Sequence, residues 1–268
     1  MNANGFTLAL AVLLLPGAST VAQQIPAGTA LPVMLHTTLD SNRSKPGDKV
    51  TGRLMQAVTL PSGERIEAGA KVEGQVVRSL EPAAPLPAML ELSFDRLRAA
   101  GKVYPISVSL RALASMHEVF DAQLPVSTFD EYGTSISDWT TVQVGGAAVY
   151  LGDGTVREAM EVVGRAPAWG VVTAKLAAAP KRGCPADPVV EERPQSLWVF
   201  SPWACGIYGF EDLAIGRLGT SQPWRIIQLT SPKAVRVRGG SGWLLLVVEP
   251  AGRGEPAKAD ASPRAATR

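Results

Sequence analysis

Apolar and polar residues alternate in short runs along residues 23–111, and Gly- and Pro-containing turns separate the runs. In the clearest run, 90–95, Leu, Leu and Phe alternate with Glu, Ser and Asp. This two-residue period is typical of a strand with one buried face. Further strand candidates occupy 31–35, 50–54, 72–77 and 103–108. Several short strands with turns between them predict a β-barrel or β-sandwich domain.

Residues 184–249 carry a second set of strand candidates and predict a smaller β-rich unit. These candidates are separated by Ser-Pro and Gly-Gly turn sequences, and they occupy 197–200, 224–229, 235–238 and 243–248. Residues 239–242 lie between the last two, which predicts a hairpin loop there. The expected fold class is therefore mainly β, with an N-terminal barrel- or sandwich-like unit and a smaller C-terminal unit.

The connecting region 112–183 has a mixed pattern. Residues 140–150 favour a strand, with a bulge or bend at their Gly-Gly pair. Apolar residues within 156–163 follow the i, i+3, i+4, i+7 spacing of a short amphipathic helix. Several β-prone residues at the end of this stretch favour strands instead, and the sequence leaves the two alternatives open.

The N-terminus carries a short apolar run, Phe6 to Leu15, followed by Pro-Gly and a string of small residues that ends at Ala22. This layout predicts a secretory signal peptide over 1–22, although no Lys or Arg precedes the run. The run is too short to cross a bilayer as a helix, which needs about 20 apolar residues. We expect an exported protein, periplasmic or extracellular, with no transmembrane segment after cleavage.

The formal net charge of the chain, +2, is too small to indicate a nucleic-acid partner. The tail 250–268 holds four basic and two acidic residues, so it accounts for the whole excess. Its Ala, Pro and Gly content predicts a disordered end. The identity of any partner stays open, with envelope proteins or glycans as the expected classes.

Cys184 and Cys205 are the only cysteines in the chain. In an exported protein an even pair predicts a disulfide bond, worth about 3 kcal/mol for a ring of this length. A zinc site is the alternative, but the chain lacks a Cys-x-x-Cys pair, and His36 and His117 are distant from both cysteines in sequence. We therefore expect a structural disulfide, and neither a metal ion nor a cofactor.

Sequence patterns typical of catalysis are absent from the chain. It contains no Gly-x-Ser-x-Gly nucleophile elbow, no phosphate-binding Gly-rich loop and no EF-hand spacing. Acidic pairs occur at 130–131, 191–192 and 211–212, but neighbouring side chains diverge on a strand or a helix. The sequence thus favours a non-catalytic, secreted or envelope-associated binding or structural protein.

Aromatic residues gather in the C-terminal part of the chain and allow a second interpretation. Four of the six Trp residues lie within 184–249. Buried aromatics ordinarily form the core of such a unit, but exposed ones can stack on sugar rings. A glycan-binding or glycan-hydrolysing protein is therefore the alternative, with Glu211 or Asp212 as acid and base. The residues that would stack are Trp198, Trp203, Tyr208, Trp224 and Trp243.

Residues 25–76 have a distinctive layout: IPAGT, then LHTTLDS, then PGDKV, and finally SGERIEAGAKVEG. Together with RPQSLWVFSPWACGIYGFEDLAIG at 193–216 and RGGSGWLLLVVE at 238–249, it resembles a group of secreted proteins of soil bacteria, especially acidobacteria. That resemblance spans nearly the whole chain and implies no known activity. The 25–76 segment is also similar, more distantly, to the C-terminal β-barrel domain of VirB10/TrbI-like conjugation and secretion proteins. This second resemblance implies a barrel fold and a role as an assembly component.

Overall fold

The structure is a computed structural model, and it describes residues 24–122, 125–126, 139–150, 155–158, 161–165, 173–177, 193–197, 199–216 and 226–248. The expected signal peptide 1–22 and the expected disordered tail 250–268 lie outside these ranges. The described residues are mainly β strand, which confirms the expected class, and their one helix is the six-residue α1 (Met116–Asp121). None of their helices is long and apolar enough to cross a membrane.

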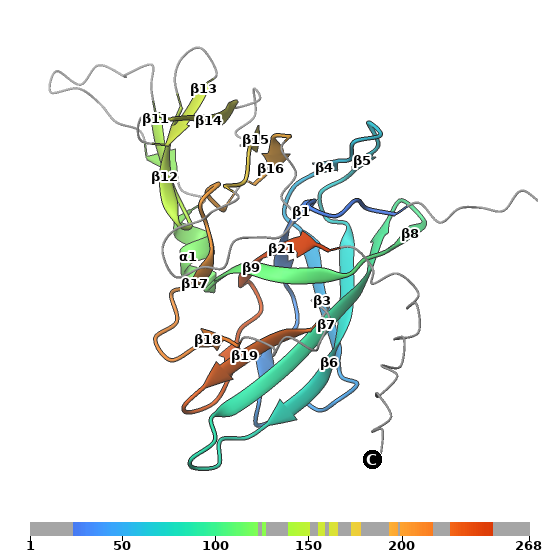
Figure 1. The fold of residues 1–268 in the computed structure, drawn as a ribbon, viewed down its shortest axis with the longest axis vertical. Coiled ribbons are helices and arrows are strands. Elements are labelled where there is room, and N and C mark those ends of the chain that lie inside the picture. Colours follow the sequence, from blue (N-terminus) through green and yellow to red (C-terminus); the bar gives the residue numbers. More distant parts are fainter. Residues whose placement is uncertain are drawn as a thin grey trace, which may run out of the picture.

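A mixed ten-stranded sheet forms the body of the molecule (Figure 1). Its strands follow the order β17-β9-β21-β1-β3-β6-β7-β19-β18, and β8 pairs with β7 off this path. All neighbours are antiparallel except β17 and β9, which run parallel. In chain order the strands are β1 (Ala30–Leu35), β3 (Lys49–Leu54), β6 (Lys71–Leu80), β7 (Ala88–Ala99), β8 (Lys102–Pro105), β9 (Val108–Ala114), β17 (Gly206–Tyr208), β18 (Ala214–Ile215), β19 (Ile227–Ser231) and β21 (Gly242–Val247).

This sheet curls because strand β7 is long enough to have two partners on one edge. Its first half pairs with β19 and its second half pairs with β8. The chain then turns through Ile106 and Ser107 into β9, which pairs with β21. Two backbone hydrogen bonds hold this corner, from Ile106 N–H to the Asp95 carbonyl (3.0 Å) and from Val248 N–H to the Ser107 carbonyl (2.8 Å). As a result β9 and β21 cross the direction of β3, β6 and β7, and the sheet has an inner and an outer face (Figure 1).

Strand β21 is buried on both of its faces, which explains its unbroken apolar run. Alternate residues from Trp243 to Val247 join the main core cluster on the inner face. Their neighbours Leu244 and Leu246 join a second cluster on the outer face, together with residues of α1. In the inner cluster the Trp243 ring lies edge-on to the Phe94 ring, with the ring centroids 5.8 Å apart.

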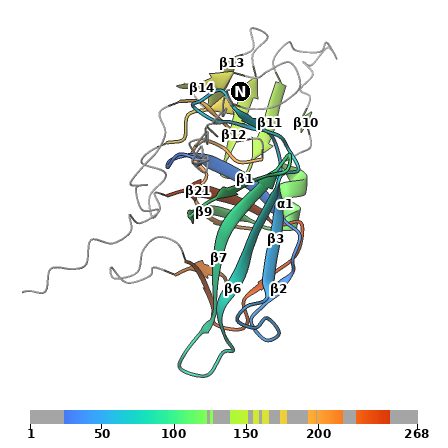
Figure 2. The same ribbon diagram turned by 90° about the vertical axis from the view of Figure 1, so that its right-hand side faces the viewer.

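A second, seven-stranded antiparallel sheet lies at one end of the curled sheet (Figures 1 and 2). Each of its strands pairs with the next along the chain. The described parts of 156–163 lie in strands, so the helical alternative for that stretch is wrong. The bend expected near Gly145 is a turn with φ +86° that closes the β11–β12 hairpin. The strands are β10 (Pro125–Val126), β11 (Trp139–Gln143), β12 (Gly146–Tyr150), β13 (Thr155–Glu158), β14 (Glu161–Arg165), β15 (Thr173–Ala174) and β16 (Gln195–Ser196).

Two buried polar side chains connect the second sheet and its flanking segments to the curled sheet. The side-chain amide of Gln195 donates to the Gly28 carbonyl (2.9 Å) and accepts from the Ala30 N–H. The guanidinium of Arg111, on β9, donates to three backbone carbonyls, those of Ala177, Pro202 and Ala204. Because buried polar groups are costly without partners, these contacts fix the segments against the sheet.

The C-terminal strands do not form the separate, smaller unit that the sequence pattern predicts for 184–249. Strands β17, β18, β19 and β21 belong to the large sheet, and β21 lies between β1 and β9. Residues 239–242 do not close a hairpin, because β20 (Arg236–Val237) pairs with β2 (Leu39–Asp40) instead of β21. The described residues of 197–200 lie outside any strand, with one isolated bridge between Phe200 and Val144. Alternation in the sequence reports which residues are buried, not which strands pair.

Two short antiparallel ribbons complete the fold. The β4–β5 hairpin (Val58–Thr59 and Arg65–Ile66) turns at Gly63, whose φ of +83° favours glycine. The β2–β20 ribbon joins segments from the two ends of the chain and lies toward the end of the molecule opposite the second sheet (Figure 2). Charged side chains of this second ribbon line a hollow at the surface.

Candidate functional site: a basic hollow on the β2–β20 ribbon

A hollow of about 260 Å³ lies on the β2–β20 ribbon. Both strands of the ribbon and the turn after β2 contribute to it. We call it the basic hollow, and its lining residues are Thr38, Leu39, Asp40, Arg43, Arg236, Val237 and Arg238.

The register of the ribbon explains why charged side chains gather on one face. Leu39 lies opposite Val237, and Asp40 lies opposite Arg236. Both apolar residues are fully buried in the main core. Because successive side chains of a strand point to opposite faces, the residues on either side of them face the solvent. The buried Leu39 and Val237 therefore hold Thr38, Asp40, Arg236 and Arg238 on the outer face.

Hydrogen bonds fix the backbone beneath these side chains. The Arg43 N–H and the Ser44 N–H both donate to the Asp40 carbonyl, at 2.9 Å and 2.7 Å. The Ser41 N–H donates to the Val235 carbonyl (2.9 Å), and the Val235 N–H donates to the Ser41 hydroxyl (3.1 Å). The arginine side chains are thus carried by an ordered turn and ribbon.

The charges of the basic hollow are only partly compensated. Asp40 accepts from the Asn42 N–H through one carboxylate oxygen (2.9 Å), and its other oxygen lies 3.3 Å from Nε of Arg236. The guanidinium groups of Arg43 and Arg238 have neither an ion pair nor a hydrogen bond with any described residue. One aspartate therefore faces three arginines, and two positive charges remain uncompensated.

Two ion-paired carboxylates, Glu64 just before β5 and Glu73 on β6, belong to a different region. Hydrogen bonds from Arg98 and Lys71, both 2.7 Å long, lower the pKa of Glu73 to about 2. Glu64 accepts from the Lys102 ammonium and from the Tyr104 hydroxyl, each at 2.8 Å. The bond to Glu64 raises the pKa of Lys102, whereas burial is the main cause of the raised pKa of Tyr104. Carboxylates held by cations in this way are poor general bases, and we regard this group as structural.

The aromatic residues expected to stack on a ligand do not share one surface. Trp243 is fully buried against Phe94, so its ring faces the core and is closed to a ligand. Trp203 and Tyr208 are half-buried, and the Tyr208 hydroxyl accepts from the Cys205 N–H at 3.1 Å. Trp198 and Trp224 lie outside the described residues. The inclusion of Trp243 in a stacking surface is thereby corrected, because β21 runs through the middle of the sheet.

The expected acid and base of the glycan-hydrolysing alternative lie at the surface. Asp212 pairs with the Lys233 ammonium at 2.8 Å, and this hydrogen bond raises the pKa of Lys233. Glu211 is exposed beside it, and neither carboxylate lines the basic hollow. The acidic pairs at 130–131 and 191–192 lie outside the part of the chain that the structure describes.

Neither a metal centre nor an imidazole base emerges among the described residues. They contain no group of three or more His, Cys, Asp or Glu side chains placed to hold a metal ion. His36, just after β1, and His117, on α1, are both exposed. In the same ranges no cysteine is a free thiol, but Cys184 lies outside them, so the Cys184–Cys205 bridge stays a prediction.

The basic hollow was missed by sequence reasoning, although one signal for it exists. The run Val235-Arg-Val-Arg238 predicts a strand whose outer face carries two arginines. Nothing in the sequence indicates that this face meets Arg43, almost 200 positions away along the chain. No protein-family model matches the chain, and none of the curated proteins matches it either.

Proposed function

We propose that this chain is an exported, non-catalytic binding or structural protein of the cell envelope, and that the basic hollow is its binding surface. The observation that carries the proposal is the pair of uncompensated guanidinium groups, Arg43 and Arg238, on an ordered ribbon. The carboxylates Glu64 and Glu73, by contrast, are each matched by a cation. A surplus of one sign around a hollow favours recognition of the opposite charge.

Export is supported by the apolar run Phe6 to Leu15 and by the small residues that end at Ala22. N-terminal sequencing of the native protein should begin at or near Gln23. A native cytoplasmic protein that retains Met1 would contradict export. In the exported protein we propose the Cys184–Cys205 bridge, and thiol titration of the unreduced, denatured chain should then detect no free cysteine.

The absence of turnover is the second testable part of the proposal. One support is that the Glu64 and Glu73 carboxylates are bound to cations. The other is that the His36 and His117 side chains are exposed, and neither has a hydrogen bond to a nucleophile among the described residues. Assays against generic ester, peptide and glycoside substrates should give no activity above the background of a mock purification. Turnover that is lost on substituting one Asp, Glu or His would refute the proposal.

The glycan-binding alternative keeps one supporting observation, the partial exposure of Trp203 and Tyr208. Soluble polysaccharides should then shift the Trp fluorescence of the wild-type protein but not that of Trp203→Phe. Unchanged emission in both proteins would remove this alternative.

The VirB10/TrbI-like assembly role has a different kind of support. The segment 25–76 that carries this resemblance supplies β1 and β3 and part of β6, three adjacent strands of the curled sheet. A fold-level likeness does not establish function. Co-purification of stoichiometric envelope partners with the native protein would favour this role over a monomeric binding module.

A further inference from the structure

We propose that the basic hollow binds a phosphate group through Arg43, Arg238 and Thr38. This inference rests on the proposed binding role and names the class of ligand. Its starting point is the charge of the hollow. The Asp40 carboxylate pairs with Arg236, and the guanidinium groups of Arg43 and Arg238 have no counter-charge in the lining. A surplus of two positive charges matches a phosphate dianion better than it matches a single carboxylate.

The arrangement of the arginines is unfavourable without an anion. Arg236 lies on β20 and Arg238 directly follows this strand, and both side chains line the hollow. Arg43 reaches the same hollow from the turn after β2. Like charges that face one another on a ribbon repel, and an anion between them would remove this repulsion.

The donors around the hollow fit a phosphate group. A guanidinium presents its N–H groups in a planar fork that pairs with two oxygens of a phosphate. The Thr38 hydroxyl accepts from the Gly239 N–H at 3.2 Å, so its own proton is left to donate to a ligand. Phosphate oxygens can accept from all three side chains at once.

The size of the hollow sets the scale of the ligand. Its volume of about 260 Å³ is below the range of roughly 300–1,000 Å³ that is typical of pockets for drug-sized ligands. The hollow is lined by exposed arginines, so a larger molecule could extend into solvent while one group occupies it. A free phosphate and the phosphomonoester headgroup of phosphatidic acid share this chemistry, because both can carry two negative charges.

The test is calorimetric titration of the mature chain, 23–268, with inorganic phosphate at low salt. We expect binding that is tighter at pH 8 than at pH 5, because inorganic phosphate is mainly a monoanion at pH 5 and mainly a dianion at pH 8. Binding should also weaken as salt is added. The double variant Arg43→Gln/Arg238→Gln should bind about 10- to 100-fold more weakly, as expected for the loss of charge-assisted hydrogen bonds.

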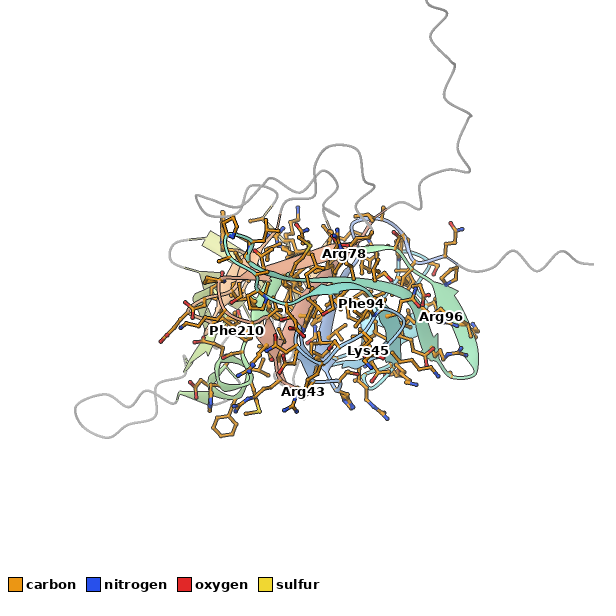
Figure 3. The ribbon with its side chains drawn as sticks, turned by 90° about the horizontal axis from the view of Figure 1, so that it is seen from below. Arg43, Lys45, Arg78, Phe94, Arg96 and Phe210 are labelled. Atoms are coloured by element: carbon orange, nitrogen blue, oxygen red, sulfur yellow. The ribbon has the colours of Figure 1, made fainter. Side chains whose placement is uncertain are left out.

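The matched control is Arg53→Gln/Arg96→Gln, which removes two exposed arginines from other strands. Arg96 is labelled at the right-hand side of the molecule in Figure 3, apart from Arg43. This control should bind phosphate within about twofold of the wild type, since it leaves the hollow intact. Asp40→Asn should bind several-fold more tightly, because it frees Arg236 while it keeps the acceptor for the Asn42 N–H.

Vesicles separate the two sources of phosphate. Vesicles of phosphatidic acid and phosphatidylcholine are compared with vesicles of phosphatidylcholine alone. Arg43- and Arg238-dependent binding to the first kind assigns a lipid headgroup, and binding of inorganic phosphate without vesicle binding assigns a soluble source. Binding of neither, or an equal loss in the Arg53/Arg96 control, would overturn the inference. An exported chain without hydrolytic activity would still satisfy the proposed function in that case, whereas turnover would refute the proposed function and leave any phosphate affinity in place.

Discussion

Two charged regions that cover the same core are organised in opposite ways. On the side of β6, β7 and β8, Glu73 is held by Arg98 and Lys71, and Glu64 by Lys102 and Tyr104. On the β2–β20 ribbon, a single aspartate serves three arginines. Both regions cover the same core cluster, so burial beneath them does not explain the difference.

The difference separates charges that support the fold from charges that are available to a ligand. An ion pair at the surface contributes little by itself, but a carboxylate that accepts two charge-assisted hydrogen bonds is positioned by them. An uncompensated guanidinium adds nothing to the stability of the chain that carries it. We therefore expect substitutions beneath or within the β6–β8 region to change stability, and substitutions in the basic hollow to change binding.

The largest effect is expected from Trp243→Ala, in the core beneath both regions. Trp243 is fully buried and contacts Phe94 edge-on. Loss of the ring should lower the free energy of unfolding by about 3–5 kcal/mol, measured by urea denaturation. Trp243→Phe serves as the control and should cost less, because it keeps an aromatic ring and removes an indole N–H that has no hydrogen-bond partner. A variant that keeps its stability and loses glycan binding would mean that Trp243 belongs to a surface instead.

A smaller effect is expected from Tyr104→Phe, within the β6–β8 region. The Tyr104 side chain is buried, and its hydroxyl donates to Glu64 at 2.8 Å. Loss of this hydrogen bond to a carboxylate should reduce the free energy of unfolding by about 1.5 kcal/mol. The neighbouring exposed Val103 gives a matched control, since Val103→Ala should change stability by no more than about 0.5 kcal/mol. Equal effects of the two substitutions would show that the Glu64 group does not stabilise the fold.

The sequence predicts the strands of this fold far better than their partners. Alternation locates the strands around Val50, Val72 and Leu90 because each has one face in the core. The same pattern predicts that β21 belongs to a separate C-terminal unit. A run of buried residues such as Trp243 shows that a strand is buried, but it does not show whether the partner strands come from the start or the end of the chain. The basic hollow shares this limit, since pairing of Asp40 with Arg236 is a contact between the two ends of the chain.

The pH dependence of stability tests the role of Glu73 in the β6–β8 region. Hydrogen bonds from Arg98 and Lys71 lower the pKa of Glu73 from 4.5 to about 2, so its ionised form is favoured in the folded state. This contribution is complete above the unfolded-state pKa of 4.5 and is lost as the pH falls through about 2. The stability difference between the wild type and Glu73→Gln should therefore shrink between pH 5 and pH 2, when unfolding is followed by urea titration at each pH. A difference that stays constant over this range would contradict the assigned cause of the pKa shift.

The smallest change in stability is expected from Arg43→Gln/Arg238→Gln, in the basic hollow. Neither guanidinium has an ion-pair or hydrogen-bond partner in the described part of the chain, and like charges repel across the hollow. The free energy of unfolding should stay within about 0.5 kcal/mol of the wild-type value, or rise slightly as the repulsion is removed. The same protein should show the weakened phosphate binding, so the two measurements on one variant separate ligand recognition from folding. A loss of stability as large as that of Tyr104→Phe would mean that the arginines support the ribbon, and the contrast between the two charged regions would then fail.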